Sequence, residues 1–495
     1  MSVHDRGPNG GPTSSRPVGE TTPLITLPEP GSHDLVYQRF SSRQKRFIVM
    51  MVSFCGIIPL FIGGSFIPSL PQISKDLDTT MTKASMVVSL SILGISIGAL
   101  TASGYSTFYG RRPIYLFYFP LFIIGSFAVA SSCTINQLIV WRFVQAFGTS
   151  PGVSVGAGVI GDIYKLEERG GAMGVFFACI LLGPTIAPFV GGFAAHYSSW
   201  RALQASIAIA GLVIFMFIYA FLPETSHPGE KGVDKMEGSK TNSVRSGHRG
   251  WAEKVKDRLP ILLNPLAPLW LLTSPNLLLV CFGNILITHT IYEVLLVPIS
   301  VTLGEKFGIW NEAVVGACFL PSGLGNMIGA PIAGRLSDYF VVRYRTQRGG
   351  LWYPEDRLRA TPYAFLLVPG SMFLSGFVTG TDYIENKTLG LSIYLFCLFV
   401  NGLGIDIVSS PSAAYFVDVM QKRSAESMAA NSSTRQVIQA AMVAAIMPMV
   451  QTYGVLVTDV ASGVLSSAGF VLMWATIRYG DRLRQWSNVE DLTDR

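Results

Sequence analysis

A few ionisable side chains stand inside otherwise uncharged apolar segments of this sequence. Arg142 is followed one helical turn later by Gln145, and Asp406 and Arg435 stand in two later segments. An ionisable group placed in hydrocarbon costs at least ~2.5 kcal/mol, so it usually has a partner and a function. We therefore predict that Arg142, Gln145, Asp406 and Arg435 take part in proton coupling or line a substrate cavity.

A further acidic candidate, Glu293, lies four residues after His289, so the two share one face of a helix. Proton antiport needs a group whose protonation changes with its surroundings. A carboxylate that alternately pairs with and parts from an arginine is such a group, and Glu293 and Asp406 are the candidates. A structural alternative stays open, in which Glu293 and Arg435 only hold two helices together, or Arg142 reaches the outer interface.

Long uncharged segments must position these residues. A membrane span needs about 20 apolar residues, and in hydrocarbon its backbone must satisfy its own hydrogen bonds. Only 14% of the residues are charged, against roughly a quarter in soluble domains. We predict an all-α polytopic membrane protein with twelve spans, near 47–70, 84–106, 114–132, 137–160, 171–194, 202–222, 276–301, 313–336, 362–380, 389–413, 429–451 and 456–477.

Positive charges fall mostly on one side of these spans. If the N-terminus is inside, 30 of the 37 Lys and Arg residues lie in the two tails, the central loop or the loops on the same side. Short loops rich in Lys and Arg stay in the cytoplasm. We therefore predict that both termini are cytoplasmic, and that the net charge of +6 reflects orientation rather than nucleic-acid binding.

The predicted spans form two halves of six helices. We predict an N-terminal half at 46–222, a cytoplasmic central loop at 223–275 and a C-terminal half at 276–478. A disordered cytoplasmic tail at 1–45 precedes them, because this stretch is rich in Gly, Pro, Ser and Thr. A short cytoplasmic tail at 479–495 follows.

Glycine spacing repeats between the halves. Small residues four apart occupy the second span of each half, offset by 231 positions: Gly94, Gly98 and Ala102, then Gly325, Gly329 and Ala333. Each fourth span has a glycine and ends in an aspartate, offset by 256 positions: Gly148 with Asp162, and Gly404 with Asp418. Small residues at this spacing allow two helices to approach closely. Two similar halves around a shared site are typical of transporters that work by alternating access.

Four short passages stand at particular places in this pattern: FIPSLPQISKDL at 66–77, WRFVQAFG at 141–148, GPTIAPFVGG at 183–192 and LPET at 222–225. Together they resemble the major facilitator superfamily, and within it the drug:proton antiporter branch with twelve transmembrane helices, of fungal type. The resemblance covers about residues 45–480. It implies two pseudo-symmetric six-helix halves and ties Arg142 to proton coupling.

The passage at 183–192 predicts a closely packed fifth helix. Gly183, Ala187 and Gly191 stand four apart, and Gly192 follows. Two prolines within the passage remove backbone donors, so we expect a kink: Pro184 and Pro188. The resemblance marks the passage as an antiporter motif, in which close packing and the kink belong to the transport cycle.

One loop departs from the family pattern. Between the second and third helices the family has Gly-x-x-x-Asp-Arg-x-Gly-Arg-Arg, whereas this chain has Thr107 and Phe108 in place of the acidic and first basic residues. We expect Arg111 and Arg112 to close this gate through contacts at helix ends instead. The second half keeps more of the pattern, at Gly334, Asp338 and Arg343.

We expect a secondary transporter rather than an enzyme. The sequence has no Walker loop, no cluster of metal ligands and no nucleophile with a base at a recognisable spacing. No cofactor or metal is therefore predicted. The expected partners are the lipid bilayer, protons and a small-molecule substrate. We expect a monomer. We place it in the plasma membrane, because that is the default location for the family it resembles.

The leading functional hypothesis is export of a small organic metabolite by proton antiport. Among possible substrates the hypothesis favours an organic acid, for example one similar to itaconate. Arg142 and Arg435 come from opposite halves, and arginine binds carboxylates with two parallel hydrogen bonds. A broad-specificity efflux pump for drugs and toxins is the alternative. A transporter-like metabolite receptor is a more distant one.

Overall fold

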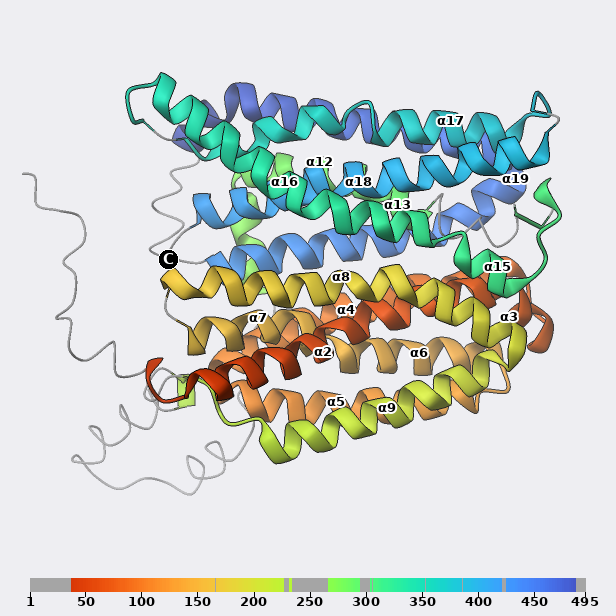
Figure 1. Ribbon diagram of the computed structural model, residues 1–495, viewed down its shortest axis with the longest axis horizontal. Coiled ribbons are helices and arrows are strands. Elements are labelled where there is room, and N and C mark those ends of the chain that lie inside the picture. The colour runs from red at the N-terminus through yellow and green to blue at the C-terminus, as the bar shows by residue number, and fades with distance from the viewer. Residues whose placement is uncertain are drawn as a thin grey trace, which may run out of the picture.

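Long helices lie side by side in the computed structural model (Figure 1), which describes residues 37–486 apart from 165, 227–230, 234–265, 294–302, 305, 352, 385 and 421–423. The helices of the first half are α2 (Ser42–Phe66), α3 (Leu70–Asp76), α4 (Met81–Tyr109), α5 (Arg111–Ala130), α6 (Ile135–Thr149), α7 (Pro151–Ile163), α8 (Leu166–Tyr197) and α9 (Trp200–Phe221). Those of the second half are α12 (Pro275–Thr288), α13 (Thr290–Glu293), α15 (Glu312–Ala317), α16 (Leu320–Gln347), α17 (Val368–Gly380), α18 (Lys387–Val419) and α19 (Ser424–Trp486).

Short 3₁₀ helices connect some of these elements: η1 (Ile67–Ser69), η2 (Ala267–Thr273) and η3 (Pro354–Ala364). The predicted tail at 1–45 and the predicted central loop at 223–275 lie largely outside the described residues, as does the second part of the span at 276–301. At the other end of the chain, α19 continues to Trp486, eight residues past the predicted boundary at 478.

The predicted helical architecture is confirmed. Within the described ranges, nine helical stretches are long and apolar enough to cross a membrane. The predicted spans at 137–160 and 276–301 correspond to pairs of shorter helices, α6 with α7 and α12 with α13. Two further predicted spans share α19, which is interrupted at Gly454, where φ is 81°. Glycine adopts this left-handed conformation without steric cost, so the two spans can be joined there without a longer loop.

The bundle has two ends. We call the end that holds the start of α2, at the left of Figure 1, the terminal end, and the end that holds α3 and α15, at the right, the far end. Two apolar clusters fill the interiors of the separate halves. A third cluster, toward the far end, combines residues of both halves, among them Phe66, Trp200, Val315 and Met447. The two halves therefore share an apolar core toward the far end.

The glycine repeat packs in the same way in both halves. A Cβ atom added at Gly94 would lie 2.8 Å from the carbonyl oxygen of Phe143, and one added at Gly325 would clash with the carbonyl oxygen of Phe399. The next glycines make equivalent approaches to carbonyl oxygens: Gly98 to Phe147, and Gly329 to Leu403. Phe143 and Phe399 differ by 256 positions, the offset already seen in the fourth spans. Thus α4 packs against α6 as α16 packs against α18.

Candidate functional site

Arg142 lies in a polar network inside the first half, and its side chain is 0% exposed. Its Nη1 atom donates to Oε1 of Gln145 over 2.6 Å, and its Nη2 atom donates to the carbonyl oxygen of Ile62 over 2.6 Å. The guanidinium carbon lies 4.4 Å from the centre of the Phe66 ring. Backbone and amide dipoles and the face of a ring therefore stabilise this buried charge.

Gln145 extends the network to two more helices. Its Nε2 atom donates to Oγ of Ser126 over 2.8 Å and to Oε1 of Gln204 over 2.9 Å. The network thus joins α2, α5, α6 and α9. Only the Nε atom of Arg142 is left without a hydrogen-bond partner. Sequence reasoning missed Ser126 and Gln204, which are two of many uncharged polar residues in the spans.

Arg142 lies on α6 and Arg435 on α19, in separate halves. Because the side chain of Arg142 is 0% exposed, a substrate cannot contact it without a rearrangement. No acidic residue of the described segments forms an ion pair with Arg142. The structure therefore suggests different tasks for the two arginines, with Arg142 organising its own half and Arg435 the more accessible of the pair.

Asp406 and Arg435 both belong to the second half, and no hydrogen bond joins them among the described contacts. Asp406, on α18, lies against α16, since a Cβ atom added at Gly329 would be 3.1 Å from its Cβ atom. Arg435 is half-buried on α19. Oδ2 of Asp406 and Nε of Arg435 are both buried and have no hydrogen-bond partner. Two charged side chains with buried hydrogen-bonding atoms that are unused offer a suitable place for a polar ligand.

Further polar atoms on the same helices are also buried without a partner: Oδ1 of Asn326, Oδ1 of Asn431, Oγ of Ser433 and Oε1 of Gln436. Each such atom costs roughly 1–3 kcal/mol unless water or a ligand satisfies it. Asn326 belongs to the same helix contact as Asp406, because a Cβ atom added at Gly402 on α18 would lie 3.0 Å from its Oδ1 atom. These uncharged residues were not predicted from the sequence.

His289 and Glu293 are only partly described. His289 is fully buried at the end of α12, with Nδ1 2.6 Å from the carbonyl oxygen of Leu286. The neighbouring Thr288 accepts a hydrogen bond of 2.9 Å from Nε2 of Gln439, which links α12 to α19. Glu293 ends α13, and its side chain lies outside the described part of the structure. The predicted shared face of His289 and Glu293 therefore stays a prediction.

At the terminal end, Arg111 links α5 to α7 and α4. Its Nε atom donates to Oδ2 of Asp162 over 2.9 Å, and its Nη1 atom donates to Oγ of Ser106 over 2.8 Å. Thr107, which replaces the family's aspartate, donates to the carbonyl oxygen of Ser103 in its own helix. Arg111 therefore has one carboxylate partner and one hydroxyl partner here.

Glu224, from the LPET passage, stabilises the start of α5. Its carboxylate accepts hydrogen bonds from the backbone N–H groups of Arg111 and Arg112, over 3.0 and 3.3 Å. Burial by itself would raise the pKa of Glu224, but donation by the N–H groups of Arg111 and Ser226 outweighs it and lowers the pKa. A negative charge at a helix N-terminus is favourable. Arg112 adds a side-chain hydrogen bond of 2.9 Å to the carbonyl oxygen of Tyr219.

The second half repeats the Arg111 contact with an additional carboxylate. Arg357 donates from Nη1 to Oδ1 of Asp338 over 3.1 Å and from Nε to Oδ2 of Asp418. Asp338 and Asp418 are the counterparts of Thr107 and Asp162 by the offsets of 231 and 256. Arg343, at the last position of the motif and so the counterpart of Arg112, donates to the hydroxyl of Tyr339. Arg357, which sequence reasoning did not single out, binds the two carboxylates.

The glycine stripe of α8 faces α2. A Cβ atom added at Gly183 would lie 3.0 Å from the carbonyl oxygen of Ile57, and one added at Gly191 would clash with the carbonyl group of Ser65. The helix continues through both of its prolines, Pro184 and Pro188. By contrast, Gly334 on α16 has open space around it, since an added Cβ would meet nothing within 4 Å.

The described contacts between the halves lie in the middle of the bundle and toward the far end. A Cβ atom added at Gly192 on α8 would lie 2.9 Å from Cα of Gly316 on α15. On the opposite side of the interface, Oγ1 of Thr82 and Oε1 of Gln451 form a hydrogen bond of 3.0 Å between α4 and α19. This distribution is the one expected of a conformation closed at the far end.

One side-chain contact also joins the halves at the far end. Nδ1 of His196 lies 3.2 Å from Oε2 of Glu312, and Nε2 of His196 lies 3.3 Å from Nδ2 of Asn311. The side chains of His196 and Glu312 are 36% and 32% exposed. A partly exposed pair of this kind contributes about 0.2–1 kcal/mol.

Glu312→Gln should therefore make opening of the far end more frequent. We expect the buried thiol of Cys318, which belongs to the apolar cluster shared by both halves, to be alkylated up to about fivefold faster. The measurement is the alkylation rate in a Cys133→Ser background, since Cys133 is exposed. Asp76→Asn is the matched control, because it breaks a far-end ion pair with Arg201 inside one half. Equal acceleration by both variants would contradict a specific role for Glu312.

Comparison with known proteins agrees with this architecture. The family model of the Major Facilitator Superfamily matches residues 52–443. The efflux pump radE of Floropilus chiversii is 28% identical over 86% of this chain and 78% of its own length. Citrate exporter 1 of Aspergillus niger is 28% identical over 63% of this chain, but the match spans only 61% of that exporter.

Solved structures show the same fold at low sequence identity. The xylose transporter XylE from E. coli, in a partially occluded inward-open conformation, matches with a TM-score of 0.61 and 14% identity, over 88% of this chain and 98% of that one. The human organic anion transporter MFSD10 matches with a TM-score of 0.53 and 17% identity, over 87% and 99%. The family model, the two six-helix halves and the contacts repeated between them lead to one conclusion: the chain belongs to the major facilitator superfamily and is a multi-pass membrane transporter.

Proposed function

We propose that this transporter exports a small organic acid in exchange for protons. The observation that carries the anionic substrate is the occurrence of Asp406 and Arg435, each partly buried with an unpartnered polar atom, on helices that hold further polar atoms without partners. Arg435 can offer a carboxylate two parallel hydrogen bonds. The names of the relatives, an efflux pump and a citrate exporter, support export and an anionic substrate.

In this proposal both termini face the cytoplasm, and the protein works in the plasma membrane as a monomer. The described contacts between the halves then hold the outer side closed. A substrate would enter from the cytoplasm and be released after the halves rock about the shared site. A bulky cation is disfavoured, because it would meet the positive charge of Arg435 at low dielectric.

A second coupling scheme is favoured by the Asp406–Arg435 pair itself. A substrate anion that displaces Asp406 from Arg435 leaves a carboxylate beside another negative charge, which promotes proton binding at Asp406. Anion and proton would then leave together. The passage at 183–192, with its likeness to antiporters, favours exchange instead. The two schemes predict opposite responses to a proton gradient, so one assay separates them.

The assay uses inside-out vesicles and measures the uptake of labelled short mono- and dicarboxylates in competition with cationic dyes. Antiport predicts that an acidic lumen speeds uptake, whereas joint transport predicts that it slows uptake. Strong uptake of dyes, with no competition by carboxylates, would instead support the broad-specificity efflux pump.

Arg435→Gln should lower the apparent affinity for the carboxylate by about 10- to 100-fold, because a hydrogen bond to a charged group contributes about 1.5–3 kcal/mol. Arg435→Lys should recover part of the affinity, since lysine keeps the positive charge but lacks the planar guanidinium group that donates two parallel hydrogen bonds. Arg343→Gln, at an exposed arginine of the same half, is the matched control. Unchanged carboxylate transport in Arg435→Gln would rule out Arg435 as a substrate contact.

A further inference from the structure

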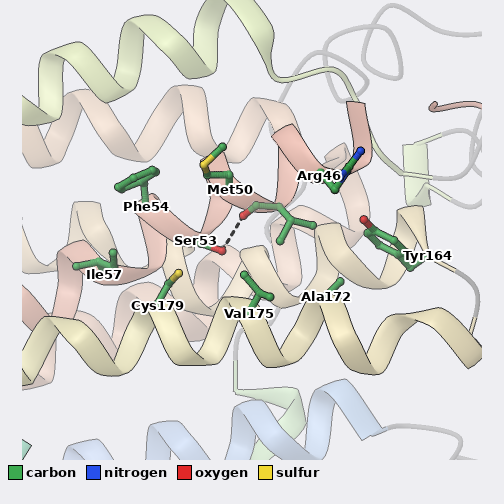
Figure 2. A pocket seen from close by; sticks show the side chains of 10 residues that line it. Arg46, Met50, Ser53, Phe54, Ile57, Tyr164, Ala172, Val175 and Cys179 are labelled. Carbon is green, nitrogen blue, oxygen red and sulfur yellow. Dashed lines mark hydrogen bonds between the residues drawn. The ribbon is translucent and has the colours of Figure 1, made fainter. Parts of the chain in front are cut away.

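A groove of about 520 Å³ opens between α2 and α8 toward the terminal end (Figure 2). Apart from Arg46 at its mouth, its principal lining residues are apolar or weakly polar: Met50, Phe54 and Ile57 from α2, and Val175 and Cys179 from α8. Met50, Phe54 and Val175 are each more than half exposed. The groove therefore lies on the outer surface of the bundle, where apolar side chains face lipid rather than a polar cavity.

Helix packing explains both the shape and the apolar character of the groove. At Gly56 the two helices are close, since an added Cβ atom would lie 2.8 Å from the side chain of Ile180. The groove opens beyond this contact, toward the start of α2. Ser53 and Tyr164 are polar residues in its wall, and the Ser53 hydroxyl donates to the carbonyl oxygen of Val49 over 2.7 Å within the same helix, as Figure 2 shows. The wall thus presents no unsatisfied polar group to an occupant.

The mouth of the groove is positively charged. Arg46 is exposed, and its Nε atom makes a hydrogen bond of 3.4 Å to the carbonyl oxygen of Ser42. No acidic residue occupies the first turn of α2, and Arg46 forms no ion pair with any side chain that the structure describes. Lys45 lies nearby with its Nζ atom 5.2 Å from the centre of the Tyr164 ring, which also lines the groove. Phe47 begins the apolar part of α2, so these cations lie at headgroup level.

We propose that this groove binds one anionic phospholipid, with an acyl chain between α2 and α8 and the headgroup phosphate at Arg46. Basic pockets between spanning helices are suited to acidic headgroups. A soluble anion would leave the apolar walls unused, and a neutral lipid would leave the positive mouth uncompensated. The bound lipid would contact α8, the helix whose opposite end packs against the second half at Gly192.

The first test uses the full-length protein in nanodiscs of phosphatidylcholine with added phosphatidylserine, followed by native mass spectrometry of the retained lipids. The wild type should retain phosphatidylserine in preference to phosphatidylcholine. Arg46→Gln should lower this preference about fivefold, as expected for one basic residue at a charged membrane surface. Arg43→Gln is the matched control, because Arg43 is exposed on the same turn and does not line the groove. Equal losses in both variants, or no preference in the wild type, would overturn the proposal.

A second variant tests the acyl-chain part of the site without changing charge. Val175→Trp should fill the groove and abolish retention of the preferred lipid. Val213→Trp on α9 is the control, since Val213 is 50% exposed and lies outside the groove. If Val175→Trp retains phosphatidylserine as well as Val213→Trp does, Arg46 binds the headgroup without the groove and the proposed site is wrong. Loss of phosphatidylcholine and phosphatidylserine to the same extent would mark a site for any lipid and would also refute the anionic specificity.

Discussion

Arg142→Ala should abolish proton-coupled transport while the protein still inserts in the membrane. The substitution removes the donors that satisfy Oε1 of Gln145 and the carbonyl oxygen of Ile62, and the Gln145 side chain would then lose its fixed position. Each buried acceptor left without a donor costs roughly 1–3 kcal/mol. The measurement is transport in reconstituted vesicles with an imposed pH gradient, together with the melting temperature of the purified variant.

Arg142→Lys separates the role of the charge from that of the hydrogen bonds. Lysine keeps the positive charge but lacks the planar guanidinium group, whose two nitrogen atoms reach both acceptors. We therefore expect partial transport activity at most. Arg335→Ala removes an exposed arginine of α16 and should leave transport unchanged. Near-normal transport by a folded Arg142→Ala protein would exclude Arg142 from proton coupling.

Gly191→Leu should stop the transport cycle without touching any charged group. A Cβ atom at this position would already clash with the carbonyl group of Ser65, and the longer leucine would push α8 away from α2. Overpacking of this kind typically costs 1–3 kcal/mol, and here it also displaces the helix that contacts the second half. The measurement is the transport rate at matched levels of folded protein.

Gly174→Leu provides the matched control for this substitution. Gly174 lies on the same helix, but an added Cβ atom there meets nothing within 4 Å. We therefore expect normal transport from Gly174→Leu and almost none from Gly191→Leu. If the two variants transport equally well, close approach of α8 to α2 is not required.

The sequence was sufficient to predict the fold because membrane spans leave a strong signal. Long uncharged runs mark the helices, and glycines four residues apart mark where α4 and α16 approach α6 and α18. The second gate was harder to predict. The position equivalent to Arg111 by the offset of 231 is Val342, and Arg357, from the longer chain between α16 and α17, makes the contacts with the carboxylates.

The candidate site was harder to predict than the fold. Gln204 and Asn326 carry no charge, and nothing in their sequence positions distinguishes them from other polar residues in spans. Glu224 stabilises a helix more than a hundred residues away in sequence, a contact that spacing alone does not reveal. The complete burial of Arg142 depends on how the surrounding helices pack, so residue type could indicate its importance but not its surroundings.

The contact between Gly192 and Gly316 has a consequence for the speed of transport. Neither residue has a side chain, so closing this part of the far end fixes no rotamers and opening it releases none. The neighbouring contact of His196 with Glu312 is partly exposed and adds only a small attraction. This glycine contact defines the closed position sharply while itself storing little free energy. The free energy of the closed far end therefore resides mainly in the apolar cluster that both halves share, and the rate of opening depends on separating that cluster rather than this contact.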